Sequence, residues 1–361
     1  MIKRRKATLV LACCLCMASA SCWYTKQGAR YLSERAGAKS TAKLSADPDT
    51  DQRLRDFLAL VNDIRSFGTE RVGLTPTKNY TSYVTLDQDY VADVVSACAS
   101  DAFSRHYWKY PLLGNLPYRG FYDREDAEEE ARRLKEAGLD VIIRKVDAFS
   151  SLGFFRDPLY SFMLDYDEDV LAEIILHESA HATLFVKGQD QFNEEFATFV
   201  GRVAAEAFLE DRYGPGSPQL RRRLERSADA RLFADYLKET ASLLDAVYSR
   251  EDLSREEKLA EKELVIQERA GRFKEVAPDL FSNQAYSGFD MAGINNAYLD
   301  LYRLYEEDLS LYRRWFEEKS AGSLTEFVAS MVDCARRARS AKLTVKELMA
   351  KELGEAALSS P

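Results

Sequence analysis

The chain has 361 residues, of which 46% are hydrophobic, so it can bury a core of one large domain or two smaller ones. This composition excludes an intrinsically disordered protein. The formal net charge is −9, and the first 21 residues contain four basic residues and no acidic one, so the rest of the chain is more acidic still. Such a charge argues against nucleic acid as a partner.

The amino terminus has the three parts of an export signal. Four basic residues precede an apolar run over residues 7–20, and small residues follow up to Ser21. This run is too short for a hydrocarbon core of about 30 Å, which needs about 20 helical residues, so a cleaved signal peptide over residues 1–21 is favoured over a membrane-spanning helix.

Cys22 follows Ala18-Ser19-Ala20-Ser21, which resembles a bacterial lipobox, although Ser19 stands where a large aliphatic residue is usual. We therefore expect Cys22 to be lipidated and to anchor an exported cell-envelope protein to a membrane, with a lipid-proximal tether over residues 22–50. Secretion without lipid and an uncleaved anchor are the alternatives.

The body is expected over residues 51–361. Apolar residues recur at helical spacing over 54–64, with Gly68 as a stop, and short strands are predicted at 83–86, 91–95 and 141–146, with a helix over 123–137 before the last. Two further helices, which carry the motifs described below, complete a region that we expect over about residues 80–210. A long helical hairpin over about 220–276 and helices over about 285–355 follow, which predicts an α+β, predominantly α-helical fold.

Two cysteines, Cys98 and Cys334, remain once the signal and Cys22 are set aside. An exported protein could join them in a disulfide, or both could be buried thiols. The sequence leaves both possibilities open.

The segment His177-Glu178-Ser179-Ala180-His181 carries two of the three histidines in the chain, at the i, i+4 spacing that places both rings on one helical face. The helix would be capped by Asp165 or Asp167 and end near Gly188. Two imidazoles at this spacing can bind a Zn²⁺ ion, and Glu178 is placed to act as general base on a zinc-bound water. The third histidine, His106, is expected to be structural.

A third ligand must come from another segment, and Glu194 is the predicted one. Asn193 would cap a second helix, on which Ala197 and Gly201 share the face of Glu194, so that small residues let the two helices approach closely. Two histidines and one glutamate leave a fourth position for water, as in catalytic sites that hold one zinc ion. Glu195 is the alternative ligand, and Thr198 could orient a ligand histidine.

HExxH followed by Asn-Glu-x-x-Ala resembles the gluzincin group of zinc metallopeptidases. Further segments resemble a family of bacterial lipoproteins known as predicted zinc aminopeptidases, and the likeness covers nearly the whole mature chain: residues 117–121, 151–155, 177–181, 186–188, 193–201 and 295–297, with Asp157-Pro158. The resemblance implies a zincin-like core in one domain, His177, His181 and Glu194 as ligands and Glu178 as catalyst. The Gly-x-Met-Glu-Asn motif of the well-known gluzincin aminopeptidases is absent, so endopeptidase and carboxypeptidase activities stay open.

The sequence therefore predicts a zinc metallopeptidase of the cell envelope that hydrolyses peptides, with aminopeptidase activity favoured. Tyr118, Arg119, Tyr160 and His106 are candidates for stabilising the oxyanion, and the strand at 141–146 could align an extended peptide. The alternative is a non-catalytic envelope lipoprotein with a structural metal site and a partner-binding hairpin. Structural zinc sites are commonly closed by four ligands, often cysteines, which favours the enzyme.

Overall fold

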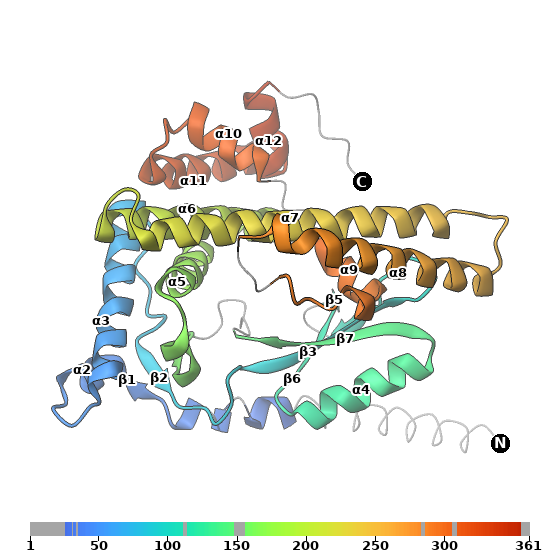
Figure 1. Ribbon diagram of the computed structural model, residues 1–361. Helices are drawn as coiled ribbons and strands as arrows, with labels where there is room; N and C mark the ends of the chain where they lie inside the picture. The colour runs from blue at the N-terminus through green and yellow to red at the C-terminus, as the bar shows by residue number, and fades with distance from the viewer. Residues whose placement is uncertain are drawn as a thin grey trace, which may run out of the picture.

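The computed structural model describes residues 26–354 apart from residues 31, 34, 111–113, 148–155, 283–285 and 305–308 (Figure 1). The expected signal peptide, Cys22 and the segment 151–155 lie outside the described residues. The fold is predominantly helical with small sheets, in agreement with the predicted class. Within the described part, no helix has the length and apolar content needed to cross a bilayer.

The first sheet has the strand order β1-β2-β8 and joins distant parts of the chain. β1 (Lys39–Ser40) pairs antiparallel with β2 (Ser82–Val84), and β2 pairs in parallel with β8 (Leu159–Tyr160). α2 (Thr41–Ala46) follows β1 directly. The body therefore begins before residue 51, because residues 39–46, predicted as tether, form paired strand and helix.

α3 (Gln52–Phe67) starts where predicted, with the Asp51 side chain accepting hydrogen bonds from two backbone amides of the first turn. The α-helix ends at Phe67 with Gly68 as its C-cap, as predicted, and the chain then continues through a π-helical turn, Gly68–Val72, up to Gly73 with φ of 82°. Gly68 also has a packing role: a Cβ there would lie 2.8 Å from Leu176 Cδ2 on the neighbouring helix α5 (Glu168–Thr183).

The second sheet has β3 (Ala92–Ala99) between β6 (Arg119–Phe121) and β7 (Leu139–Val146), all antiparallel. α4 (Arg124–Glu136) packs against it through a small apolar core that includes Val95, Leu134 and Val141. A short hairpin of β4 (Trp108–Tyr110) and β5 (Gly114–Leu116) lies beside it. The predicted small sheet with an adjacent helix is present.

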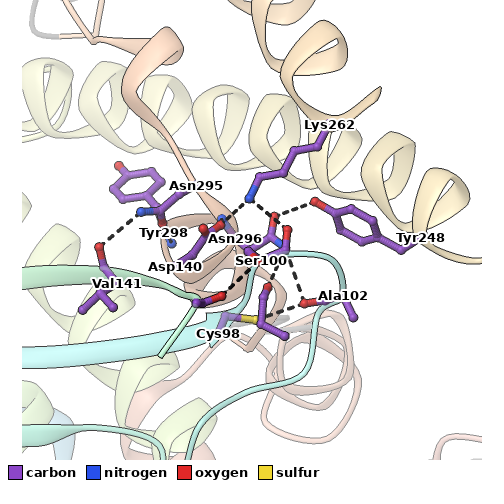
Figure 2. A network of polar contacts seen from close by, with 12 residues as sticks. Cys98, Ser100, Ala102, Asp140, Val141, Tyr248, Lys262, Asn295, Asn296 and Tyr298 are labelled. Carbon is purple, nitrogen blue, oxygen red and sulfur yellow. Dashed lines mark hydrogen bonds and ion pairs between the residues drawn. The ribbon is translucent and has the colours of Figure 1, made fainter. Parts of the chain in front are cut away.

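The helical hairpin consists of α7 (Pro218–Tyr248) and α8 (Arg255–Leu280), and α9 (Asn296–Leu304) packs against it. A buried polar network joins the helical hairpin to the second sheet (Figure 2). Asn296 accepts a hydrogen bond from Tyr248 Oη at 2.8 Å and donates to Ala99 O at 2.9 Å, while Lys262 pairs with Asp140 of β7. The segment 295–297 thus holds the hairpin, α9 and the sheet together.

The largest core surrounds α6 (Asp190–Tyr213). α5 (Glu168–Thr183), which follows the 3₁₀ turn Ser161–Asp165, packs against one side of α6. The opposite side faces α10 (Ser310–Glu318), α11 (Leu324–Ala341) and α12 (Val345–Glu352), as Figure 1 shows. Cys98, on β3, and Cys334, on α11, are both free and buried, so the two thiols do not pair.

Candidate metal centre

α5 carries His177 and His181 on one face, as their spacing predicts. Their ring centroids are 4.8 Å apart with an interplanar angle of 83°, and their Nε2 atoms are 3.1 Å apart. Asp167 is the residue before the first turn, although its side chain makes no capping hydrogen bond. The helix ends at Thr183, five residues before the predicted stop at Gly188, which instead lies in the connecting loop with φ of 79°.

The second motif helix starts earlier than predicted. α6 begins at Asp190, so Asn193 lies inside its first turn and is not the cap. The buried Asn193 side chain accepts a hydrogen bond from Val186 N at 2.8 Å and donates one to Val186 O at 2.9 Å. One amide group can do both because it carries an acceptor and a donor, and it thereby closes the loop between the two helices.

Gly201 allows α5 and α6 to approach closely at the level of His177. A Cβ on Gly201 would lie 3.0 Å from His177 Cβ and 3.1 Å from the backbone oxygen of Glu173. Ala197, one turn earlier on the same face, is fully buried. The face of small residues therefore lies against the histidine helix, as the sequence predicted.

Glu194 projects from α6 towards both rings. Its carboxylate oxygens lie 3.5 Å from His181 Nε2 and 3.8 Å from His177 Nε2. Ligand atoms about 2.0–2.1 Å from one zinc ion at the tetrahedral angle are about 3.3–3.4 Å apart, and the three measured separations bracket that value. His177, His181 and Glu194 form the only cluster of its kind in the described part of the chain, and its donor set fits one zinc ion.

The protonation of His177 agrees with this fit. Burial lowers the pKa of His177 to about 4, which leaves a neutral imidazole with a lone pair. Burial would also lower the pKa of His181, but its hydrogen bond to Glu194 raises it, and the same hydrogen bond lowers the pKa of Glu194. Glu194 has 57% of its side chain exposed, so the centre is open to solvent.

Glu178 follows His177 on α5 and is half-buried. Burial raises the pKa of Glu178 to about 7, and the negative charges of Asp157 and Glu194 add to this effect. A carboxyl group with a pKa near 7 is suited to taking and returning a proton at neutral pH.

Glu195 faces away from the two rings. Its buried carboxylate pairs with Lys346 of α12 at 2.8 Å and accepts a hydrogen bond from Gln191. In this arrangement, the Glu195 carboxylate is therefore not the alternative metal ligand. Thr198 is buried on α6, but His181 Nδ1 has no hydrogen-bond partner in the described part of the chain, so Thr198 does not orient that ring.

Of the four residues considered for oxyanion stabilisation, three belong to the second sheet and its surroundings. The His106 ring contacts Trp108, Arg119 lies in β6 and pairs with Glu130 of α4, and Tyr118 immediately precedes β6. Tyr160, at the end of β8, lies in the core around α5 and α6.

Two residues near Glu178 were not recognised as site residues from the sequence. Burial raises the pKa of Tyr80 well above its ordinary value, and the charges of Glu178 and Asp157 act on it in the same direction. Asp157 acts on Glu178 as well. Tyr80 has φ of 61°, a left-handed conformation that is uncommon for a residue other than glycine. Asp157 belongs to the Asp157-Pro158 pair that carries part of the family resemblance, whereas Tyr80 has no local sequence signature of a site.

Comparison with known proteins gave one result. A protein-family model described as "Putative aminopeptidase" matches residues 23–344. No match was found among curated proteins or among solved structures.

Proposed function

The chain belongs to the family described as "Putative aminopeptidase", a family of peptidases, and we propose that it hydrolyses peptide bonds with one zinc ion and with Glu178 as general base. The observation that carries this proposal is the convergence of His177 Nε2, His181 Nε2 and the two Glu194 carboxylate oxygens at separations of 3.1 to 3.8 Å. A half-buried glutamate lies beside them.

Each residue has a distinct part. His177, His181 and Glu194 would hold the ion, which would supply Lewis acidity to a peptide carbonyl and to water. Glu178 takes a proton from the attacking water and passes it to the leaving amine, and its raised pKa favours both transfers. Gly201 and Asn193 keep α5 and α6 at the spacing that this geometry needs.

The setting of this activity is part of the proposal. A signal peptide over residues 1–21 and a lipid on Cys22 would place the enzyme in the bacterial cell envelope, attached to a membrane. Its partners are then peptide substrates and the membrane. The acidic charge of the chain supports the absence of nucleic acid among them.

The test compares the wild type with Glu178→Gln on a broad peptide library, with bound zinc measured in both. We expect one zinc per chain in both proteins and a loss of about 10²- to 10⁴-fold in the hydrolysis rate of the variant, the usual contribution of general acid-base catalysis. Glu136→Gln, at the exposed end of α4, is the matched control and should keep the wild-type rate.

Two results would contradict the proposal. A Glu178→Gln protein with wild-type activity would exclude Glu178 as the base. A zinc-loaded wild type that cleaves no peptide in the library would favour the non-catalytic lipoprotein with a structural metal.

A further inference from the structure

The chain is docked on the body from its first described residues onwards. Lys26 pairs with Asp123 at 3.1 Å and with Asp126 at 2.6 Å, where α4 begins. The buried side chain of Gln27 accepts a hydrogen bond from Tyr122 N at 2.9 Å. These contacts hold the chain to the end of β6 and the first turn of α4.

From this docking point the chain runs along one side of the molecule to the first sheet (Figure 1). The Arg35 guanidinium donates a hydrogen bond to Arg156 O at 2.6 Å, shortly before β8. β1 then pairs with β2, and α2 packs against α3. The described residues between 26 and 46 are termed the basal segment. In Figure 1 it lies at the bottom of the molecule, whereas α10, α11 and α12 lie at the top, beyond α6.

The link between Cys22 and the basal segment is short. A chain spans at most about 3.6 Å per residue, so the Cα atoms of Cys22 and Lys26 are at most about 14 Å apart. A compact chain of this size has a radius of gyration of about 20 Å. A lipid on Cys22 would therefore keep the docking point of Lys26 close to the bilayer, and the side with α10 to α12 could not reach it.

The distribution of charge favours the same orientation. Residues 22–46 contain five basic residues and one acidic residue, a net charge of +4, whereas residues 47–361 carry a net charge of −17. An anionic lipid surface attracts basic side chains and repels acidic ones within about one Debye length, about 10 Å at moderate salt. The basal segment is therefore the part of the chain that an anionic membrane attracts.

Two lysines of the basal segment are available to lipid headgroups. Lys39 and Lys43 are exposed and line one open hollow together with Ser40 and Asp47. No ion pair among the residues that the structure describes engages either lysine. Leu32, in the same segment, is 65% exposed. Basic groups combined with an exposed apolar side chain are typical of surfaces that lie on a membrane.

We propose that the basal segment is the face of the protein that lies on the membrane, where Lys39 and Lys43 bind the phosphate groups of anionic phospholipids. This inference rests on the lipid anchor at Cys22 that forms part of the proposed function, and it adds an orientation and an electrostatic contact. Acyl chains and a basic patch commonly act together in membrane attachment. The C-terminal helices α10 to α12 are then directed away from the bilayer.

The experiment measures which face approaches the bilayer. The exported, processed chain carries one introduced cysteine, Ser45→Cys on α2 or Ser340→Cys on α11, at an exposed position that is labelled with a maleimide fluorophore. Cys98 and Cys334 are free but buried, so the introduced thiol is the one that reacts. Each protein is reconstituted in vesicles that contain a lipid with a nitroxide headgroup, in phosphatidylcholine alone or in an equal mixture with phosphatidylglycerol. Mass spectrometry reports the lipid on Cys22.

Lysine variants test the electrostatic contact with the label at position 45. Lys39→Gln with Lys43→Gln removes two charges from the basal segment. Lys319→Gln with Lys351→Gln is the matched control, because it removes two exposed charges from the ends of α10 and α12.

On anionic vesicles we expect strong quenching of the label at position 45 and none at position 340. A basic residue near an anionic surface shifts the binding equilibrium about fivefold, so the loss of both Lys39 and Lys43 should lower the ratio of bound to free basal segment about 30-fold. The control pair should leave this ratio unchanged. High salt should lower it in the wild type, because salt screens the attraction.

Equal quenching at the two positions, or stronger quenching at position 340, would overturn the proposed orientation. Quenching that is the same on neutral and anionic vesicles and in the Lys39 and Lys43 variant would overturn the role of the two lysines. If Cys22 carries no lipid, the chain should still bind anionic vesicles through the basal segment, and a lack of binding would overturn the proposal. These measurements use no peptide, so a failure of the proposed hydrolysis would leave their outcome unaffected.

Discussion

Substitution of Gly201 by alanine tests the close approach of the two metal-binding helices. The added methyl group would meet His177 Cβ at 3.0 Å and Glu173 O at 3.1 Å. Both atoms belong to the backbone or the first side-chain carbon of α5, so no flexible side chain can move aside. The helices must separate by a few tenths of an ångström, at the turn that carries the first histidine ligand.

The expected change in the unfolding free energy of Gly201→Ala follows from two opposing effects. Alanine is more favourable than glycine in a helix interior by about 0.5–1 kcal/mol. Overpacking of a tight contact costs about 1–3 kcal/mol. Gly271→Ala, within α8, provides the control for the first term alone, because a Cβ there has no neighbour within 4 Å. The two variants should therefore differ by about 1–3 kcal/mol in unfolding free energy.

The assay is chemical denaturation of the metal-free proteins, followed by zinc titration against a chromogenic chelator. Gly271→Ala should be more stable than the wild type and bind zinc equally well. Gly201→Ala should bind zinc roughly tenfold more weakly, since strain of about 1.4 kcal/mol at His177 corresponds to a factor of ten. If both variants gain the same stability and keep wild-type zinc affinity, the helix contact does not position the ligands.

Three further results are expected. Asn296→Ala removes the hydrogen-bond partner of the buried Tyr248 hydroxyl and of the Ala99 carbonyl, and should lower the unfolding free energy by about 2–5 kcal/mol. Chemical denaturation measures this change. A loss below about 1 kcal/mol would contradict the network. Lys346→Met leaves the buried Glu195 carboxylate without its ion-pair partner and should lower the unfolding free energy by about 3–5 kcal/mol. The double variant in which Glu195 also becomes Met should recover this stability. A double variant no more stable than Lys346→Met would refute the pairing. Burial raises the pKa of Cys98 and of Cys334 to about 12, so at pH 8 neither thiol should react with a thiol reagent until the chain is unfolded, and reaction of the native protein would contradict their burial.

Features with a local cause were predictable from the sequence. The i, i+4 histidine spacing requires only a helix, and the hairpin is dense in good helix formers between turn signals. The small residues after Glu194 indicated the helix contact because their spacing matches the helical period. In each case the residues that decide the structure are neighbours in the chain.

Features that depend on distant contacts were missed or misplaced. Gly68 ends the α-helix as predicted, but its close contact with Leu176, which lies on another helix, was not foreseen. Asn193 has the composition of a cap, yet its amide closes the preceding loop. The places of Tyr80 and Asp157 depend on pairing across nearly eighty residues, which no local pattern reports.

The adjacent residues Glu194 and Glu195 show why the far side of α6 matters to the metal centre. Successive helical side chains are rotated by about 100°, so only one of the two carboxylates can face the histidines. Sequence alone left that choice open. Lys346, on α12, fixes it by pairing with Glu195 on the opposite side of the helix, where Phe196 is also buried. The C-terminal helices therefore set the rotation of α6 and direct Glu194 towards the two imidazoles, although they contribute no ligand in this arrangement.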